Sequence, residues 1–279
     1  MNAIKTGFLL VALTLMLVLG GQAFGGRQGM TLALVLAAGM NFLAYFFSDK
    51  IPLAMSGARP VTPAEAPRLY RITEGLCARA GLPMPRLYVI PQAQPNAFAT
   101  GRNPQKAAVA CTAGLLETME DDEIEGVLAH ELSHVKNRDT LIMSVAATLA
   151  GAITYLAHMA KWALIFGGGR SRDGNGNALG ALLMLILAPI AALLIQLAIS
   201  RQREYAADAG AARFVGHPYG LVKALEKLGH YSQRIPMRGV QPAQAHMYIV
   251  QPFAGGLASL FSTHPPLEER IRRLRSLSM

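Results

Sequence analysis

Four long apolar stretches limit how this chain can fold more than any other feature. They cover residues 8–24, 30–47, 141–166 and 178–199. A helix needs about 20 apolar residues to cross the hydrocarbon core of a membrane, and the last stretch reaches that length. The first two lie near the lower limit, and the third is interrupted by His158 and Lys161. Since only 15% of the residues are charged, against about 25% in soluble domains, we predict a membrane protein with four spans.

The first apolar stretch has a second interpretation. Lys5, the apolar run and the small residues Gly21-Gln22-Ala23 imitate a secretory signal peptide, which would be cleaved. The second stretch, however, begins after only a short turn, residues 25–29. A helical hairpin explains both stretches together, so we expect a transmembrane hairpin there.

The distribution of basic residues predicts how the spans are oriented. Residues 48–140 hold ten Lys and Arg and residues 200–279 hold eleven, whereas the loop 25–29 holds one and the loop 167–177 holds two. Because cytoplasmic segments collect Lys and Arg, we expect both long segments and both termini in the cytoplasm. The loop 167–177 would then lie on the opposite side of the membrane, where its two Arg do not fit this rule. The second pair of spans is therefore less strongly predicted. The same bias explains the formal net charge of +9 without a nucleic-acid partner.

The segments outside these stretches carry both helical and extended patterns. Apolar spacing and turn residues predict helices over 64–80, from Thr118 through His134, and over 267–277, a strand over 86–90, and a hairpin of strands 96–100 and 107–112. The helix that begins near Thr118 can continue into the third apolar stretch. These patterns indicate a mainly helical α+β fold.

One of these helices contains a metal-binding pattern, His130-Glu131-x-x-His134. Positions i and i+4 lie on one helix face, so both imidazoles can bind one ion. Zinc suits such a site because it binds imidazole nitrogen and accepts an open fourth position, and Glu131 can then take a proton from water. A pair of surface histidines on an acidic helix is the alternative. We favour one Zn²⁺ per chain with Glu131 as the general base.

A catalytic zinc needs a third protein ligand, and the segment after the last apolar stretch offers one. Glu204 and Asp208 are again spaced i and i+4. We interpret Glu204 as the third ligand and Asp208 as the group that orients a zinc-bound histidine through its other ring nitrogen. Both carboxylates could instead pair with neighbouring Arg, and His246 is then the reserve ligand. A membrane hairpin over 141–199 would return the chain to the face it left, which would bring Glu204 close to His134.

With these motifs the chain resembles the HtpX family of bacterial membrane zinc metalloproteases, which is related to the CAAX prenyl endopeptidases. The resemblance rests on residues 95–101, the zinc-motif helix, residues 200–208 and the run Ser262-Thr263-His264-Pro265-Pro266, and the four apolar stretches fall where that family has them. It implies a gluzincin-type endopeptidase at the cytoplasmic face of the inner membrane. It also implies that the substrates are misfolded or damaged membrane proteins, degraded as part of a stress response.

The resemblance further implies two contacts with the substrate. In gluzincin-type proteases an edge strand near the zinc holds the substrate backbone, and this chain has a similar run at Asn96, Ala97, Phe98 and Ala99. An ordinary hairpin strand is the alternative. His264 could donate to the tetrahedral intermediate or only cap the helix 267–277. We interpret the basic residues 270–275 as a solvated helix face that can touch anionic lipid.

The expected architecture therefore has four transmembrane helices and a gluzincin-like cytoplasmic zinc protease domain. Its expected parts are an N-terminal hairpin (1–47), a first cytoplasmic part with the zinc motif (48–140), a second hairpin (141–199) and a second cytoplasmic part with the third ligand (200–279). Two other functions stay open. A site-2-type protease would place the motif inside the bilayer, where the charges around it are costly. A non-catalytic scaffold or chaperone-like protein would bury a closed structural metal.

Overall fold

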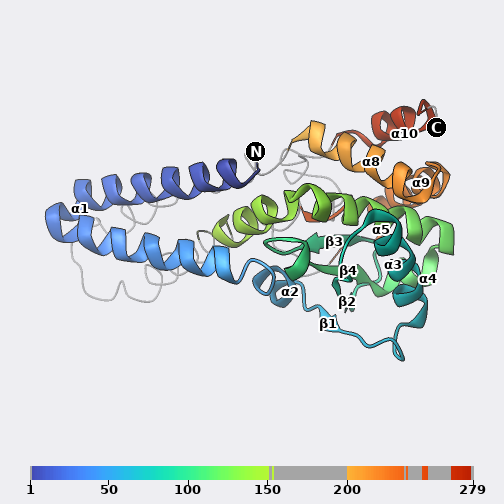
Figure 1. Ribbon diagram of the computed structural model, residues 1–279. Helices are drawn as coiled ribbons and strands as arrows, with labels where there is room; N and C mark the ends of the chain where they lie inside the picture. The colour runs from blue at the N-terminus through green and yellow to red at the C-terminus, as the bar shows by residue number, and fades with distance from the viewer. Residues whose placement is uncertain are drawn as a thin grey trace.

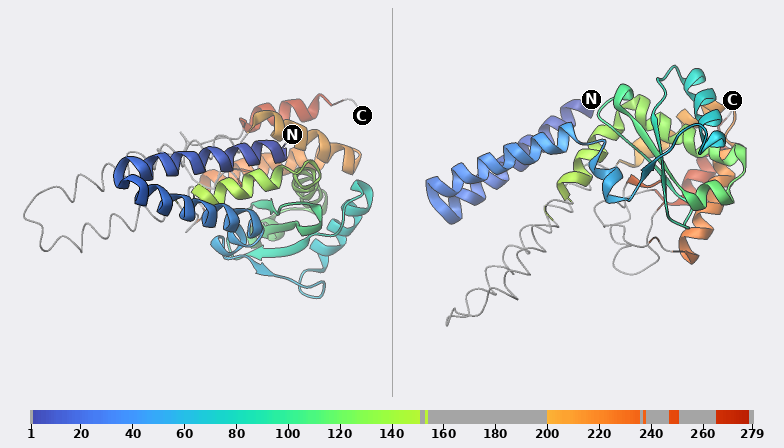
Figure 2. Two further views of the ribbon diagram at one scale, coloured as in Figure 1. Left: turned by 60° about the vertical axis from the view of Figure 1, so that its left-hand side comes forward. Right: turned by 90° about the horizontal axis from the view of Figure 1, so that it is seen from below.

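The computed structural model describes residues 2–150, 153, 200–235, 237, 247–250 and 265–277. Most of the third predicted span, the whole of the fourth, and the candidate residues His246 and His264 lie outside these ranges. The described part contains a long helical hairpin and a mixed α+β body, and the hairpin projects away from the body in every view (Figures 1 and 2).

The hairpin is helix α1 (Asn2–Phe46), which is broken at Gly26. Gly26 has φ 57° and ψ −144°, a conformation that glycine adopts without steric cost. The two arms then come so close that a Cβ added to Gly21 would lie 2.4 Å from the carbonyl oxygen of Gly29. Farther along, Asn41 Nδ2 donates to Thr14 Oγ1 at 2.8 Å and so joins the two arms. The expected turn between the first two apolar stretches is confirmed.

The surface of α1 is strongly apolar. Large side chains on both arms, among them Phe8, Leu19, Leu32 and Val35, are more than 60% exposed. In the described part, one helix is long and apolar enough to cross a membrane, Gly26–Phe46, while Thr6–Leu19 and Asp139–Ala150 are shorter. The described fold is thus mainly helical α+β with one candidate membrane helix.

The body is built on a four-stranded mixed sheet in the order β1-β2-β4-β3. Its strands are β1 (Arg59–Pro60), β2 (Arg86–Ile90), β3 (Ala97–Thr100) and β4 (Ala108–Thr112). β2 runs parallel to β4, and β3 runs antiparallel to β4 with Phe98 opposite Ala110. Both the strand over 86–90 and the hairpin across residues 101–104 are therefore confirmed, and β3 lies at the edge of the sheet.

Helix α5 (Asp121–Asn137) is the central helix of the body. It packs against the edge strand β3 on one side and against α8 (Arg201–Val215) and α9 (Tyr219–Arg234) on the other, with α3 (Pro67–Ala80) beside it (Figure 1). The short helices α2 (Ile51–Met55) and α4 (Ala113–Thr118) and the C-terminal α10 (Leu267–Arg275) complete the described body. Its core includes the fully buried Leu76, Leu115, Leu128 and Leu225.

Both ends of α5 differ from the sequence prediction. The helix does not begin near Thr118, which ends α4. Glu120 caps α5 instead, and the side chain of Glu123 reaches back to the Glu120 backbone in a capping box. At the other end Arg138 has φ 59°, which interrupts the helix before a new one covers Asp139–Ala150. The chain therefore turns between the metal-motif helix and the third apolar stretch.

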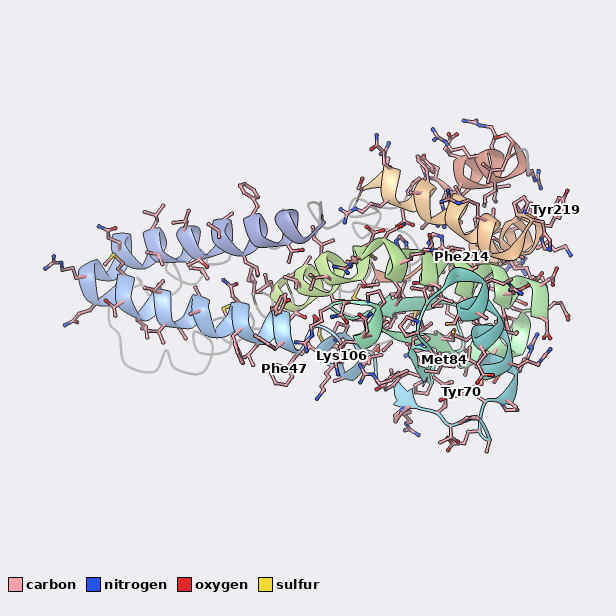
Figure 3. The ribbon with its side chains drawn as sticks, in the orientation of Figure 1. Phe47, Tyr70, Met84, Lys106, Phe214 and Tyr219 are labelled. Atoms are coloured by element: carbon pink, nitrogen blue, oxygen red, sulfur yellow. The ribbon has the colours of Figure 1, made fainter. Side chains whose placement is uncertain are left out.

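The hairpin joins the body at a cluster of polar and basic contacts. The Thr100 hydroxyl donates to the Ser48 carbonyl at 2.7 Å and lies 2.6 Å from the Ser144 hydroxyl, which ties the hairpin base to β3 and to the helix Asp139–Ala150. Lys50 lies over the ring of Phe47. Figure 3 places Phe47 and Lys106 at this junction and Tyr70 in the body away from the hairpin.

Candidate metal centre and active site

Helices α5 and α8 bring His130, His134 and Glu204 together in the buried centre of the body. The Nε2 atoms of the two histidines are 3.2 Å apart. Glu204 Oε1 lies 3.4 Å from His134 Nε2, and Oε2 lies 3.7 Å from His130 Nε2. One ligand atom from each residue falls within 4.8 Å of the others, and each side chain is almost completely buried. The spacing i and i+4 on α5, together with α8, thus creates one site that could hold a metal ion.

The Nδ1 atoms of both histidines, here called the outward nitrogens because they point away from Glu204, face carboxylates. His130 Nδ1 lies 2.9 Å from Asp208 Oδ1, and His134 Nδ1 lies 3.1 Å from Asp139 Oδ2. With a proton on each Nδ1 toward these carboxylates, both Nε2 atoms face Glu204, on the side where a metal ion would bind. Metal-binding histidines are oriented in this way, so the donor set fits Zn²⁺. Asp208 lies where the sequence predicted, whereas Asp139 was missed.

Close packing of glycine brings α8 to this position. A Cβ on Gly210 would come within 2.0 Å of Ser133 Oγ and 3.0 Å of Ser133 Cβ, so a larger residue there would require Ser133 or one of the helices to shift. Ser133 lies between the two histidines on α5, and Gly210 lies two residues after Asp208. The contact therefore sets the distance at which Glu204 and Asp208 face the imidazoles.

Arg270 of α10 supports the centre by binding the carboxylate of Asp208. Its Nε donates to Asp208 Oδ2 at 2.9 Å and its Nη2 donates to Asp208 Oδ1 at 2.7 Å, while Nη1 lies 3.8 Å from Glu204 Oε2. The side chain is fully buried, so the interpretation of residues 270–275 as one solvated face is wrong at this position. The sequence did contain a signal: Arg270 lies at i+3 from Leu267 and i−4 from Leu274, on the apolar face of the helix.

Glu131 is a buried carboxyl group beside the three candidate ligands. It is 2% exposed, and burial raises its pKa to about 7. A backbone hydrogen bond from Ala99 of β3 opposes part of that rise. A carboxyl with a pKa near neutrality can both accept and return a proton at physiological pH, which is what a general base and acid requires.

The charges of the surrounding groups follow from burial and close pairing. Burial lowers the pKa of His130 to about 4. Burial alone would also lower the pKa of His134, but its bonds to Asp139 and Glu204 outweigh burial and raise the pKa to about 10. Burial would raise the pKa of Asp208, but the Arg270 guanidinium outweighs it and holds the pKa at about 2. A metal ion must therefore displace a proton from His134 when it binds.

The edge strand β3 passes directly beside Glu131. The carbonyl of Asn96 faces β4, where it accepts from Thr112 N at 2.9 Å. Because successive residues of a strand direct their backbone groups to opposite sides, Ala97 and Ala99 direct theirs to the outer side, and Ala99 N–H donates to Glu131. All four predicted residues Asn96, Ala97, Phe98 and Ala99 are buried. His264 and His246 lie outside the described residues.

The fold and this buried His-His-Glu group define a metallopeptidase, and comparison with known proteins identifies its family. Residues 63–278 match the model of "Peptidase family M48", and the chain belongs to that family. It is 59% identical over 276 residues to a "Protease HtpX homolog" of Desulfatibacillum aliphaticivorans, covering 98% of this chain and 89% of the relative. It is 50% identical over 279 residues to a protein of the same description from Thermococcus sibiricus, covering 99% and 96%. The chain is thus an HtpX-type metalloendopeptidase.

A solved structure shares the fold. The crystal structure of S. mikatae Ste24p superposes with a TM-score of 0.53 at 22% sequence identity. The match covers 98% of this chain but only 65% of Ste24p. At this identity the likeness concerns the fold, and it extends over the hairpin α1 as well as the body.

Proposed function

We propose that this chain is a zinc endopeptidase in which His130, His134 and Glu204 bind the metal, Glu131 is the general base and Asp208 orients His130. The observation that carries this proposal is the pairing of both outward nitrogens with carboxylates, which directs both Nε2 atoms toward one point. Three protein ligands leave a fourth position for substrate, as in catalytic zinc sites. A scaffold with a closed structural metal would need a fourth ligand.

The reaction proposed is hydrolysis of a peptide bond. Zinc bound at this site would act as a Lewis acid on the scissile carbonyl. Glu131 takes a proton from the attacking water and then delivers it to the leaving amine, for which a pKa of about 7 is suited. Asp208 and Asp139 hold the two imidazoles in place during the reaction. The adjacent edge strand, Asn96–Ala99, is proposed to bind the substrate backbone, which recognises main chain with little sequence preference.

The protein is proposed to work at the cytoplasmic face of the bacterial inner membrane, on unfolded or damaged membrane proteins. The exposed apolar surface of α1 supports membrane insertion, because soluble proteins rarely expose contiguous apolar patches this large. Basic and aromatic side chains meet where the hairpin joins the body, as is typical of a cytoplasmic membrane interface. Lys50 lies over the ring of Phe47, and Arg102 lies over the ring of Phe46. Four spans, with the parts 1–47, 48–140, 141–199 and 200–279, belong to the same proposal.

Zinc analysis combined with a cleavage assay tests this function. Glu204→Gln should lose bound zinc and cleavage of an unfolded membrane protein. Glu226→Gln is the matched control, because Glu226 is 46% exposed and pairs with the exposed Arg275, outside the candidate ligand set. Retention of zinc by Glu204→Gln would remove Glu204 from the ligand set. Zinc without cleavage in the wild-type protein would support the scaffold alternative.

A further inference from the structure

The outer side of the edge strand β3 is covered by a distant segment of the same chain, residues 247–250. Ile249 N–H donates to the Ala97 carbonyl at 3.1 Å. The amide side chain of Asn96 binds both backbone groups of Val250, since Nδ2 donates to the Val250 carbonyl at 3.0 Å and Val250 N–H donates to Oδ1 at 3.4 Å. The bond to Ala97 is the kind of main-chain contact that an added strand makes with a sheet edge, and the Asn96 side chain supplies the next two contacts along the segment.

Side chains hold the same segment in place from two directions. The ring of Tyr248 packs edge-on against Phe98 with the centroids 5.2 Å apart, and Tyr248 is completely buried. Arg270 Nη1 donates to the Ile249 carbonyl at 3.1 Å while its other nitrogens hold Asp208. Arg270 therefore joins residues 247–250 to the support of the metal centre.

The groups that residues 247–250 occupy are those that an extended peptide would need beside Glu131. Ala97 and Ala99 share the outer side of β3, and the N–H of Ala99 already points to Glu131. A peptide that pairs with β3 next to this carboxyl must use the carbonyl of Ala97, which Ile249 now occupies. An incoming peptide and residues 247–250 cannot use that carbonyl in the same way at once.

We propose that residues 247–250, here called the strap, are an internal occupant of the substrate strand position, and that an extended peptide binds by displacing the strap. The inference rests on the proposed peptidase function and adds a regulatory step to it. Opening requires loss of the Ile249 and Val250 backbone bonds, of the Arg270 bond to the Ile249 carbonyl and of the Tyr248 ring contact. It also exposes the four strap side chains, which are all buried in the closed state. The pair between Arg270 and Asp208 does not involve the strap and can persist, so the metal centre stays assembled.

Hydrogen exchange in the Glu131→Gln variant tests displacement without altering the strap. This variant binds but should not cleave unfolded β-casein, which serves as the extended-peptide probe. The amides of residues 247–250 should exchange faster when β-casein is present in saturating amount. Unchanged or slower exchange on confirmed binding would overturn the proposal, because the strap would then remain on β3.

A pair of variants at Tyr248 tests the effect on activity. Tyr248→Ala removes the ring from Phe98 and should raise kcat/KM for β-casein at least about fivefold, the factor that loss of the aromatic pair alone gives, because the buried area of the ring is lost as well. Tyr248→Phe keeps the ring and should match the wild type. Slower cleavage by Tyr248→Ala with zinc content and melting temperature retained would show that the strap supports the site, which contradicts the proposal. If the wild type cleaves β-casein and Tyr248→Ala cleaves it no faster, the strap proposal is wrong but the peptidase function stands. If none of the proteins cleaves β-casein, the proposed peptidase function is contradicted as well.

Discussion

Arg270 lies in a helix rich in basic residues, but it has a specific role in the candidate metal centre. It binds Asp208 with two hydrogen bonds, and Asp208 in turn holds His130. Partners of metal-binding histidines typically contribute about 10-fold to 100-fold in metal affinity. We expect Arg270→Gln to weaken zinc binding by about that factor, and Arg270→Lys to restore part of it because the charge returns. Competition with a zinc chelator measures the affinity.

The control for Arg270 lies on the same helix. Arg272 is 77% exposed and pairs with Glu269, so Arg272→Gln should leave zinc affinity unchanged. Equal zinc affinity in Arg270→Gln and the wild type would show that Asp208 needs no guanidinium to hold His130.

The raised pKa of Glu131 predicts that its ionised carboxylate, which the proposed mechanism needs, lowers the stability of the fold. Its folded-state pKa of about 7 lies above the ordinary 4.5, so the fold loses stability as pH rises from about 4.5 to about 7. Below about 4.5 this penalty is absent, and above about 7 it is complete. The shift corresponds to about 3 kcal/mol at 1.36 kcal/mol per pKa unit. Metal-free Glu131→Gln should therefore unfold at a higher temperature than metal-free wild type at pH 8, with the difference shrinking toward pH 5. A difference independent of pH would contradict the shift.

Residue types and spacing predicted part of the candidate site, and each residue that they missed has a specific physical reason. His130, Glu131 and His134 followed from helix periodicity, and Glu204 with Asp208 followed from the same spacing plus the need for a third ligand. Asp139 could not be found in this way, because it reaches His134 only through the left-handed turn at Arg138. Pairing of the strap with β3 joins positions 154 residues apart, for which the sequence carries no local signal.

At the scale of elements, the position of α5 between the sheet and α9 depends on glycine. A Cβ on Gly126 would lie 2.4 Å from the backbone nitrogen of Leu221, and backbone cannot move aside as a flexible side chain can. We expect Gly126→Ala to destabilise the body by about 1–3 kcal/mol, the usual cost of overpacking. Denaturant unfolding in detergent measures the change.

Gly75 in α3 provides the matched control. The nearest atom to a Cβ there is the end of the Arg79 side chain at 3.9 Å, so Gly75→Ala should stabilise helix α3 by up to about 1 kcal/mol. Equal stability of the two variants would mean that α5 and α9 can separate without cost. Sequence periodicity predicted the core of each helix, but close approaches such as this one depend on tertiary packing.

The whole molecule combines an apolar hairpin with a polar body, and this division predicts a topology. Gln28 lies exposed at the tip of the hairpin and Gln105 lies exposed on the body near the hairpin base. Cys77 and Cys111 are both buried, so a cysteine introduced at either glutamine should dominate labelling by an impermeant thiol reagent. Gln105→Cys should be labelled only from the cytoplasmic side and Gln28→Cys only from the opposite side. Labelling of both from one side would show that the hairpin does not span the bilayer.

The most direct test of the account is the comparison of wild type with Glu131→Gln. Glutamine keeps the size of the side chain but cannot accept the proton of the attacking water, while His130, His134 and Glu204 remain to bind metal. Both proteins should contain about one zinc per chain, as a single three-ligand site implies, and only the wild type should cleave an unfolded membrane protein. Undiminished cleavage by zinc-loaded Glu131→Gln would contradict the assignment of this carboxyl, and with it the proposed mechanism.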